Sequence, residues 1–170
     1  MLFRSIADLK KPEVREKLEG RIQGIDPGAG LMQASEEALE TYDLDDYELV
    51  SASGAAMTAA LSRAIERKEW IVVTGWSPHW KFAKWDLRYL EDPEGTLGGL
   101  ERVHVMARKN FYQDYPKVAE FLTRMYLPLE DLQAIMLEAS NTSYEKAVEN
   151  YIAKNEDRVN YWVTGEMPQS

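Results

Sequence analysis

The chain has 170 residues, a formal net charge of −9 and no cysteine. This length suits one domain with a sizeable core, and two full domains are not expected. The negative charge argues against a nucleic-acid-binding surface and against adsorption to anionic lipid. The lack of cysteine excludes disulfides, thiol catalysis and zinc–thiolate sites.

No apolar run in the sequence approaches the ~18 residues of a membrane span. The first residues, "MLFRSIADLKKPEV", contain no apolar stretch of signal-peptide length. We therefore expect no export signal within the chain itself.

The first part of the chain alternates predicted strands and helices. β-Branched and apolar runs predict strands at 20–26, 47–53 and 69–76, and three- and four-residue apolar spacing predicts helices at 31–44 and 53–68. Ser53 is the expected N-cap of the second helix. This order predicts an α/β fold with a mostly parallel sheet flanked by helices.

The second part becomes helical. Two further strands are predicted at 88–92 and 102–109. Three helices are then predicted at 115–126, 128–140 and 143–163, with Pro116, Pro128 and Ser143 near their starts. The predicted organisation is an α/β core over about 18–110 and a helical C-terminal segment over about 112–165.

A glycine-rich turn, "GIDPGAGLM" (24–32), joins the first strand to the first helix. It lacks the Lys-Ser/Thr pair of a phosphate loop, and its glycines do not match the dinucleotide fingerprint. Exposed N–H groups at a helix start nevertheless predict a site for an anion such as a carboxylate. The alternative is that the glycines only make a tight turn.

Trp76 directly follows the third predicted strand. In open α/β sheets ligands bind beyond the carboxyl ends of the strands, so Trp76 and the glycine-rich turn are expected at the same edge. An indole face attracts quaternary ammonium groups. Core packing is the alternative for Trp76, and it is the expectation for the other four tryptophans, Trp70, Trp80, Trp85 and Trp162.

No catalytic or metal site is predicted. His79 and His104 lack partners at ligand spacing, so a hydrogen-bonded loop position and a structural strand position are expected for them. The acidic segment 43–48 lacks EF-hand spacing and is expected to be a solvated loop. We expect no cofactor.

The whole chain, from "SIADLKKPEV" to about Trp162, resembles the glycine betaine and related quaternary-amine binding proteins of ABC importers. The stretches that carry the resemblance are "GIDPGAGLM", "SASGAAMTAAL", "VVTGWSPHWKFAKWDLRYLEDPEG" and "VHVMARKNF". The resemblance implies a lobe like those of type II periplasmic binding proteins. Such proteins have two lobes that close around a small zwitterion, with an aromatic cage around the trimethylammonium head.

The resemblance assigns three ligand-binding residues to this chain. Trp76 matches a cage tryptophan, and Gly30 and Leu31 match the residues whose backbone N–H groups meet the carboxylate. A second half with a "WLPxTH"-like motif, which supplies another cage tryptophan and a carboxylate-binding histidine, is absent here. The chain is therefore expected to be a single lobe, and its isolated affinity for glycine betaine is expected to be weak.

The resemblance also implies partners and location. The expected partners are a zwitterionic quaternary amine taken up as an osmoprotectant, the complementary lobe and the membrane permease of an ABC importer. The parent protein is expected to work outside the cytoplasm and to have no enzymatic activity. Two alternatives stay open: a sensor lobe with the same ligand class, and a small enzyme that acts on a carboxylate through His79.

Overall fold

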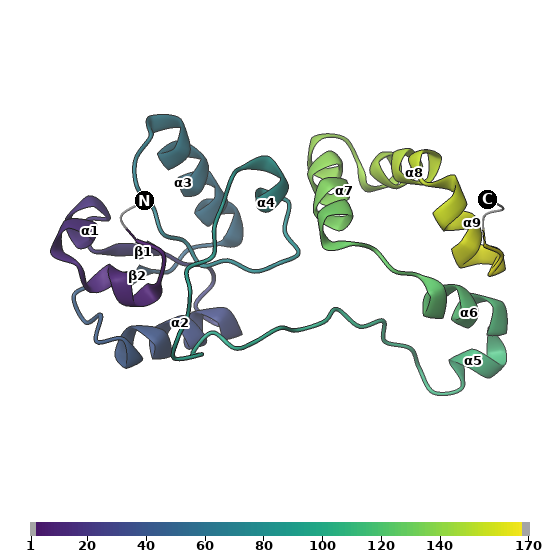
Figure 1. Cartoon of the computed structure of the whole chain (residues 1–170), viewed down its shortest axis with the longest axis horizontal. Helices are drawn as coiled ribbons and strands as arrows, with labels where there is room; N and C mark the ends of the chain where they lie inside the picture. Colours follow the sequence, from purple (N-terminus) through teal and green to yellow (C-terminus); the bar gives the residue numbers. More distant parts are fainter. Residues whose placement is uncertain (1–2, 168–170) are drawn as a thin grey trace. The chain divides into compact units, whose positions relative to one another are not determined.

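The structure is a computed structural model that describes residues 3–167 (Figure 1). These residues form two compact units, which we describe separately. The first unit contains residues 3–76 and Arg88–Leu100, and the second contains Ser77–Leu87 and residues 101–167. Among residues 3–167, no helix combines the length and the apolar character needed to cross a bilayer.

The first unit is built on a short parallel sheet. β1 (Arg21–Gln23) pairs with β2 (Glu48–Val50), with Ile22 opposite Leu49. On its other side, Gln23 forms a parallel bridge to Val73. Its N–H donates to the Val72 carbonyl and its carbonyl accepts from the Thr74 N–H, both at 2.9 Å. The three predicted parallel segments are thus present, with β1 in the centre, although the third is reduced to one bridge.

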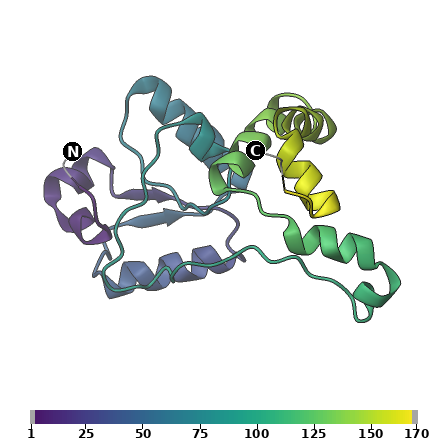
Figure 2. The same ribbon diagram turned by 45° about the vertical axis from the view of Figure 1, so that its right-hand side comes forward.

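Two helices connect these strands and cover opposite faces of the sheet, α2 (Gly30–Thr41) and α3 (Gly54–Arg67) (Figure 2). The predicted cap of α3 is confirmed, because Ser53 Oγ accepts the Ala56 N–H at 3.1 Å. Near the N-terminus lie a 3₁₀ helix, η1 (Ile6–Lys10), and α1 (Pro12–Lys17). The larger buried cluster joins η1, α1, β1 and the end of α2, and consists of Ile6, Leu9, Val14, Leu18, Ile22, Ala38, Tyr42, Leu44 and Tyr47.

The two later predicted strands are not formed. Within 88–92, Glu91 makes only an isolated bridge to Ser5, through the hydrogen bonds from Ile6 N–H to Glu91 O and from Glu91 N–H to Arg4 O. The segment 102–109 contains no strand residue. A strand exists only where a neighbouring strand accepts its hydrogen bonds, and the described residues offer none to this segment.

A turn after Glu91 is anchored to the core by Tyr42. The Tyr42 hydroxyl donates to Asp92 Oδ1 at 2.6 Å and accepts the Glu94 N–H at 2.8 Å. Asp92 Oδ2 also accepts the Leu97 N–H at 2.7 Å. Burial alone would raise the pKa of Asp92, but the hydrogen bonds from Leu97, Tyr42 and Thr96 together hold it below its ordinary value.

The second unit is helical. Its elements are α4 (Lys81–Lys84), α5 (Phe111–Asp114), α6 (Pro116–Arg124), α7 (Leu129–Asn141), α8 (Tyr144–Lys154) and α9 (Glu156–Thr164). α7 packs against α4 and α8, and α6 packs against α5 and α9. The predicted single helix over 143–163 is wrong, because the chain breaks at Asn155. There the Asn155 side-chain amide donates to the Tyr151 carbonyl at 2.9 Å, in competition with the helical pattern.

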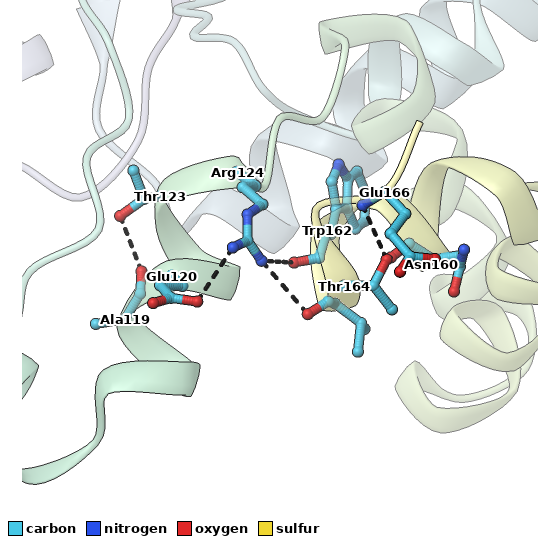
Figure 3. A network of polar contacts seen from close by, with 9 residues as sticks. Ala119, Glu120, Thr123, Arg124, Asn160, Trp162, Thr164 and Glu166 are labelled. Atoms are coloured by element: carbon cyan, nitrogen blue, oxygen red, sulfur yellow. Dashed lines mark hydrogen bonds and ion pairs between the residues drawn. The ribbon is translucent and has the colours of Figure 1, made fainter. Parts of the chain in front are cut away.

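Arg124 joins α6 to the end of α9 (Figure 3). Its guanidinium donates to the Trp162 and Val163 carbonyls at 3.3 and 3.4 Å and to Glu120 Oε2 at 3.1 Å. A cation at the C-terminus of a helix satisfies otherwise unpaired carbonyls and complements the helix dipole. Arg124 therefore acts as a side-chain cap for α9.

Candidate ligand-binding site

The first turn of α2 presents two unused backbone donors. Ala29 is the N-cap and provides no side-chain cap, and the first bonds into the helix are those from the Met32 and Gln33 N–H groups to the Ala29 carbonyl. Within residues 3–167 no protein acceptor meets the N–H of Gly30 or of Leu31. The helix dipole adds partial positive charge here, and the first turn contains no acidic residue. The arrangement suits an anion.

The glycines of the turn leave this end of α2 open. A Cβ atom at Gly28 or Gly30 would meet no heavy atom within 4 Å. Neither glycine adopts a positive φ, so their conformation does not require glycine. Their effect is access, because a ligand atom can approach the backbone closely where side chains are missing.

Met32 fixes the position of this helix end. Its side chain is fully buried, and its sulfur accepts the Ile25 N–H at 3.2 Å. A Cβ atom at Gly24 would lie 2.5 Å from the Met32 sulfur, so the helix sits against the strand end where only glycine fits. Ile25, Met32 and Met57 on α3 form the smaller core cluster.

Trp76 lies at the same edge of the sheet. It follows Thr74, which is buried and hydrogen-bonded to Gln23, by two residues. The chain leaves β1 toward Gly30 and leaves the third parallel segment toward Trp76 in the same direction, because the two segments are parallel. Trp76 is 38% exposed, so it is not a core residue. The three residues that the resemblance predicts to bind the ligand thus belong to one unit and one edge.

The remaining tryptophans divide into two groups. Trp162 is buried, and Trp70 packs against the larger core cluster with its ring 5.4 Å from that of Phe3, so the expectation of core packing holds for both. Trp80 and Trp85 are half-buried and contact each other at 5.6 Å, with Lys84 Nζ over both rings. These two are partly solvent-facing and are not core residues.

His79 is hydrogen-bonded in its loop, as predicted. Its Nδ1 accepts the Lys81 N–H at 3.1 Å, which leaves Nε2 as the protonated nitrogen of the neutral ring. Burial, and then the charge of Lys81, lower the pKa of His79 below its ordinary value. A neutral imidazole held in this way is a hydrogen-bonding group at neutral pH.

His104 is exposed and lies outside any strand, so its predicted position within a strand is wrong. The acidic side chains of the segment 43–48 lie at the surface, where Asp43 pairs with Lys10 and Asp46 with Arg15, whereas Leu44 and Tyr47 of the same segment are buried. Across residues 3–167, no three histidine, aspartate or glutamate side chains gather as a metal site would require.

Four residues that are important in the structure escaped prediction: Met32, Tyr42, Asp92 and Lys81. Met32 and the Tyr42–Asp92 pair act through contacts between segments distant in sequence, and no local pattern indicates such contacts. Lys81 is 1% exposed although it is charged, and burial lowers its pKa to about 8. The only available indication was its position among apolar and aromatic residues in "HWKFAKW".

Comparison with known sequences gives a family match over most of the chain. Residues 3–154 match the substrate-binding domain of ABC-type glycine betaine transport systems. The glycine betaine/carnitine transport binding protein GbuC of Listeria monocytogenes is 39% identical over 158 residues. That alignment covers 91% of this chain and 53% of GbuC, so the chain spans about half the length of this relative.

Solved structures give the same fold. Lactococcal OpuAC, in a closed-liganded conformation with glycine betaine, superposes with a TM-score of 0.79 at 40% identity, over 96% of this chain and 63% of OpuAC. ProX from Borrelia burgdorferi gives 0.75 at 34% identity, over 95% and 61%. A choline-binding protein in complex with choline gives 0.69 at 24% identity, over 97% and 59%, and supports the fold alone. These neighbours are type II periplasmic binding proteins, which confirms the predicted fold class.

Proposed function

This chain belongs to the family of substrate-binding domains of ABC-type glycine betaine transport systems, and we propose that it supplies one half of a cleft for glycine betaine or a similar quaternary-ammonium zwitterion. The observation that carries the proposal is the pair of unbonded N–H groups at Gly30 and Leu31, on the sheet edge where Trp76 is exposed. One unit thus offers a donor pair and an aromatic face to a small dipolar molecule.

The donor pair suits the carboxylate of such a ligand. Hydrogen bonds to a charged group contribute about 1.5–3 kcal/mol each, more than bonds between neutral groups. The positive end of the α2 dipole favours the same charge. The carboxylate end of the ligand therefore needs no lysine or arginine side chain. A positively charged side chain there would also attract anions that carry no cationic group.

The aromatic face suits the cationic head. A quaternary ammonium has no N–H to donate, so a carboxylate side chain gains little specificity over a π face. If the complete cage contains two further rings outside this chain, the isolated chain lacks about 1–4 kcal/mol at this pole, at ~0.5–2 kcal/mol per ring. Each 1.4 kcal/mol is about tenfold in affinity, so the isolated chain binds weakly.

We also propose the role, location and partners of the whole protein to which this chain contributes. The family serves transport, and we propose that this chain acts without catalysis as part of a two-lobed binding protein outside the cytoplasm. Its partners are then the complementary lobe and the permease of an ABC importer. Closure of the two lobes delivers the ligand to the permease.

Titration calorimetry with glycine betaine tests the proposal in two proteins. One is this chain alone, and the other is a joined protein in which the part of GbuC without counterpart here is linked to this chain in the order found in GbuC. The joined protein is expected to bind glycine betaine at least about 100-fold more tightly than the chain alone. A micromolar dissociation constant for the chain alone would contradict the half-site, and a folded joined protein that binds no betaine would contradict the ligand class.

A further inference from the structure

The hydroxyl of Thr74 is buried without a hydrogen-bond partner. Thr74 is 6% exposed, and within residues 3–167 no group donates to its Oγ1 or accepts from it. An unpaired buried hydroxyl is unfavourable, and a valine of nearly the same shape would avoid its cost. Because almost all buried polar groups in folded proteins are paired, this exception calls for a physical explanation.

The backbone of Thr74 is fixed at the sheet edge that carries the candidate ligand-binding residues. Its N–H donates to the Gln23 carbonyl at 2.9 Å. The bridge between Gln23 and Val73 sets the register, so Gly24 is the neighbour of Thr74 on β1's side of the ladder. Trp76 follows two residues later. Thr74 therefore belongs to the same unit and the same edge as the three candidate ligand-binding residues.

The side chain of Thr74 belongs to the face of the sheet that α2 covers. Successive residues of an extended segment point to opposite faces, so Thr74 shares the face of Val72. Val72 packs against the larger core cluster, which includes residues of α2. On the same face, a Cβ atom at the neighbouring Gly24 would lie 2.5 Å from the sulfur of Met32. Met32 is in the first turn of α2, so the Thr74 hydroxyl lies between the sheet and this turn.

The first turn of α2 is where the proposed function places the carboxylate of the ligand. An ionised carboxylate accepts hydrogen bonds at about four lone-pair sites, and the N–H groups of Gly30 and Leu31 use two of them. A hydroxyl can donate to another of these sites, and a bond from a hydroxyl to a carboxylate is stronger than a bond between neutral groups. A carboxylate at this turn is therefore an acceptor that suits the Thr74 hydroxyl.

We propose that the Thr74 hydroxyl is a third hydrogen-bond donor to the carboxylate of the ligand, and that it gains this partner only when the ligand binds. This inference rests on the proposed function and adds a side chain to a pole otherwise made of backbone N–H groups. The hydroxyl oxygen is enclosed in the structure, so the bond requires a small shift of the first turn of α2. Binding then relieves the cost of the unpaired hydroxyl, and this relief contributes to affinity.

Thermal unfolding of the chain alone tests whether the hydroxyl is unpaired. Thr74→Val is expected to raise the melting temperature by at least about 2 °C, because valine keeps the shape and removes the unpaired group. Thr58→Val is the matched control, since the Thr58 hydroxyl already lies 3.1 Å from the Gly54 carbonyl oxygen and 3.0 Å from that of Ala55. This control is not expected to raise the melting temperature. An unchanged or lower melting temperature of Thr74→Val would overturn the proposal.

Titration calorimetry of the joined protein with glycine betaine tests the contact with the ligand. Thr74→Val is expected to weaken betaine binding at least about fivefold, although the same substitution raises the melting temperature. Thr74→Ser keeps the hydroxyl and loses a buried methyl group. It is expected to lower the melting temperature and yet to bind betaine at least about fivefold more tightly than Thr74→Val. A role in packing alone would not move stability and affinity in opposite directions.

The outcomes separate this inference from the proposed function. Betaine binding by the joined protein that stays unchanged in Thr74→Val would keep the proposed function and remove Thr74 from the site. A folded joined protein that binds no betaine would contradict the proposed function, and the contact between Thr74 and the ligand would be overturned with it. Weaker binding by Thr74→Val, recovered in Thr74→Ser, would support both.

Discussion

The Ile25 N–H donates to the Met32 sulfur at 3.2 Å, and this contact ties the end of β1 to the first turn of α2. Met32 is fully buried against a glycine, Gly24, on the same strand end. The position of the unbonded N–H groups at Gly30 and Leu31 therefore depends on a packed core contact two residues inside the helix. The candidate site is held by the core rather than by its own loop.

Gly24→Ala is expected to destabilise the chain by about 1–3 kcal/mol, because overpacking a well-packed core costs this much. The added Cβ would lie 2.5 Å from the Met32 sulfur and 3.1 Å from the Val50 carbonyl oxygen. Urea unfolding followed by circular dichroism measures the change. Gly28→Ala is the control, since its Cβ meets nothing within 4 Å and its stability should stay within about 0.5 kcal/mol of wild type or rise slightly.

Gly30→Pro is expected to weaken glycine betaine binding by the joined protein at least about tenfold while the fold stays intact. Gly30 is the first residue of α2, where proline is tolerated, and Ala29 before it has φ −76° and ψ 140°, which proline favours in its predecessor. The substitution removes one N–H donor, and a hydrogen bond to a charged group contributes about 1.5–3 kcal/mol.

Gly30→Ala is the matched control for this prediction, because it keeps the donor and adds only a methyl group at the same position. Titration calorimetry gives the affinities, and thermal unfolding confirms the fold of both variants. Equal affinities for Gly30→Pro and wild type would show that the Gly30 N–H does not meet the ligand.

The first unit was largely predictable from the sequence because its elements have local causes. The apolar spacing of α2, the Ser53 cap of α3 and the glycine-rich turn each act over a few residues. The edge position of Trp76 followed from parallel topology. Local patterns could not predict that 88–92 and 102–109 form no strand, because strand formation depends on a neighbouring strand.

The break at Asn155 and the burial of Lys81 escaped prediction for different reasons. The apolar spacing of α8 continues into α9, so periodicity gives one helix, and only the side-chain bond of Asn155 to Tyr151 reveals the break. Lysine is almost never fully buried, so composition predicts an exposed Lys81. The burial of Lys81 is a tertiary effect that prevails over composition, whereas the break at Asn155 involves a local side-chain bond that apolar periodicity does not register.

Trp76→Ala is expected to weaken betaine binding by the joined protein by more than about fivefold, since a desolvated cation–π contact contributes roughly 0.5–2 kcal/mol. Trp85→Ala is the control. Trp85 is also partly exposed, and it contacts Trp80 and Lys84. Calorimetry with glycine betaine and thermal unfolding of both variants separate a binding effect from a folding effect. A larger loss of affinity with Trp85→Ala than with Trp76→Ala would move the aromatic pole to Trp85.

Lys81→Met is expected to stabilise the chain at pH 7. It is also expected to reduce the change of the chain's stability with pH between about pH 8 and pH 10.5. Burial lowers the pKa of Lys81 to about 8 from an ordinary value of 10.5. In this window the unfolded chain binds more protons at Lys81 than the folded chain, so stability rises with pH. Below pH 8 the buried ammonium is charged in both states and its full desolvation cost opposes folding.

The measurement for Lys81→Met is thermal unfolding at pH 7, 8.5 and 10. The variant should melt at least about 2 °C above wild type at pH 7, and this difference should shrink as pH rises. The exposed Lys84 gives the control, since Lys84→Met removes a charge without relieving burial and should not raise the melting temperature at pH 7 as Lys81→Met does. A second readout is the His79 imidazole, whose pKa the Lys81 charge lowers. NMR titration should show that the pKa of His79 rises toward its ordinary value in Lys81→Met. An unchanged His79 pKa, together with an unchanged dependence of stability on pH, would contradict a charged, buried Lys81.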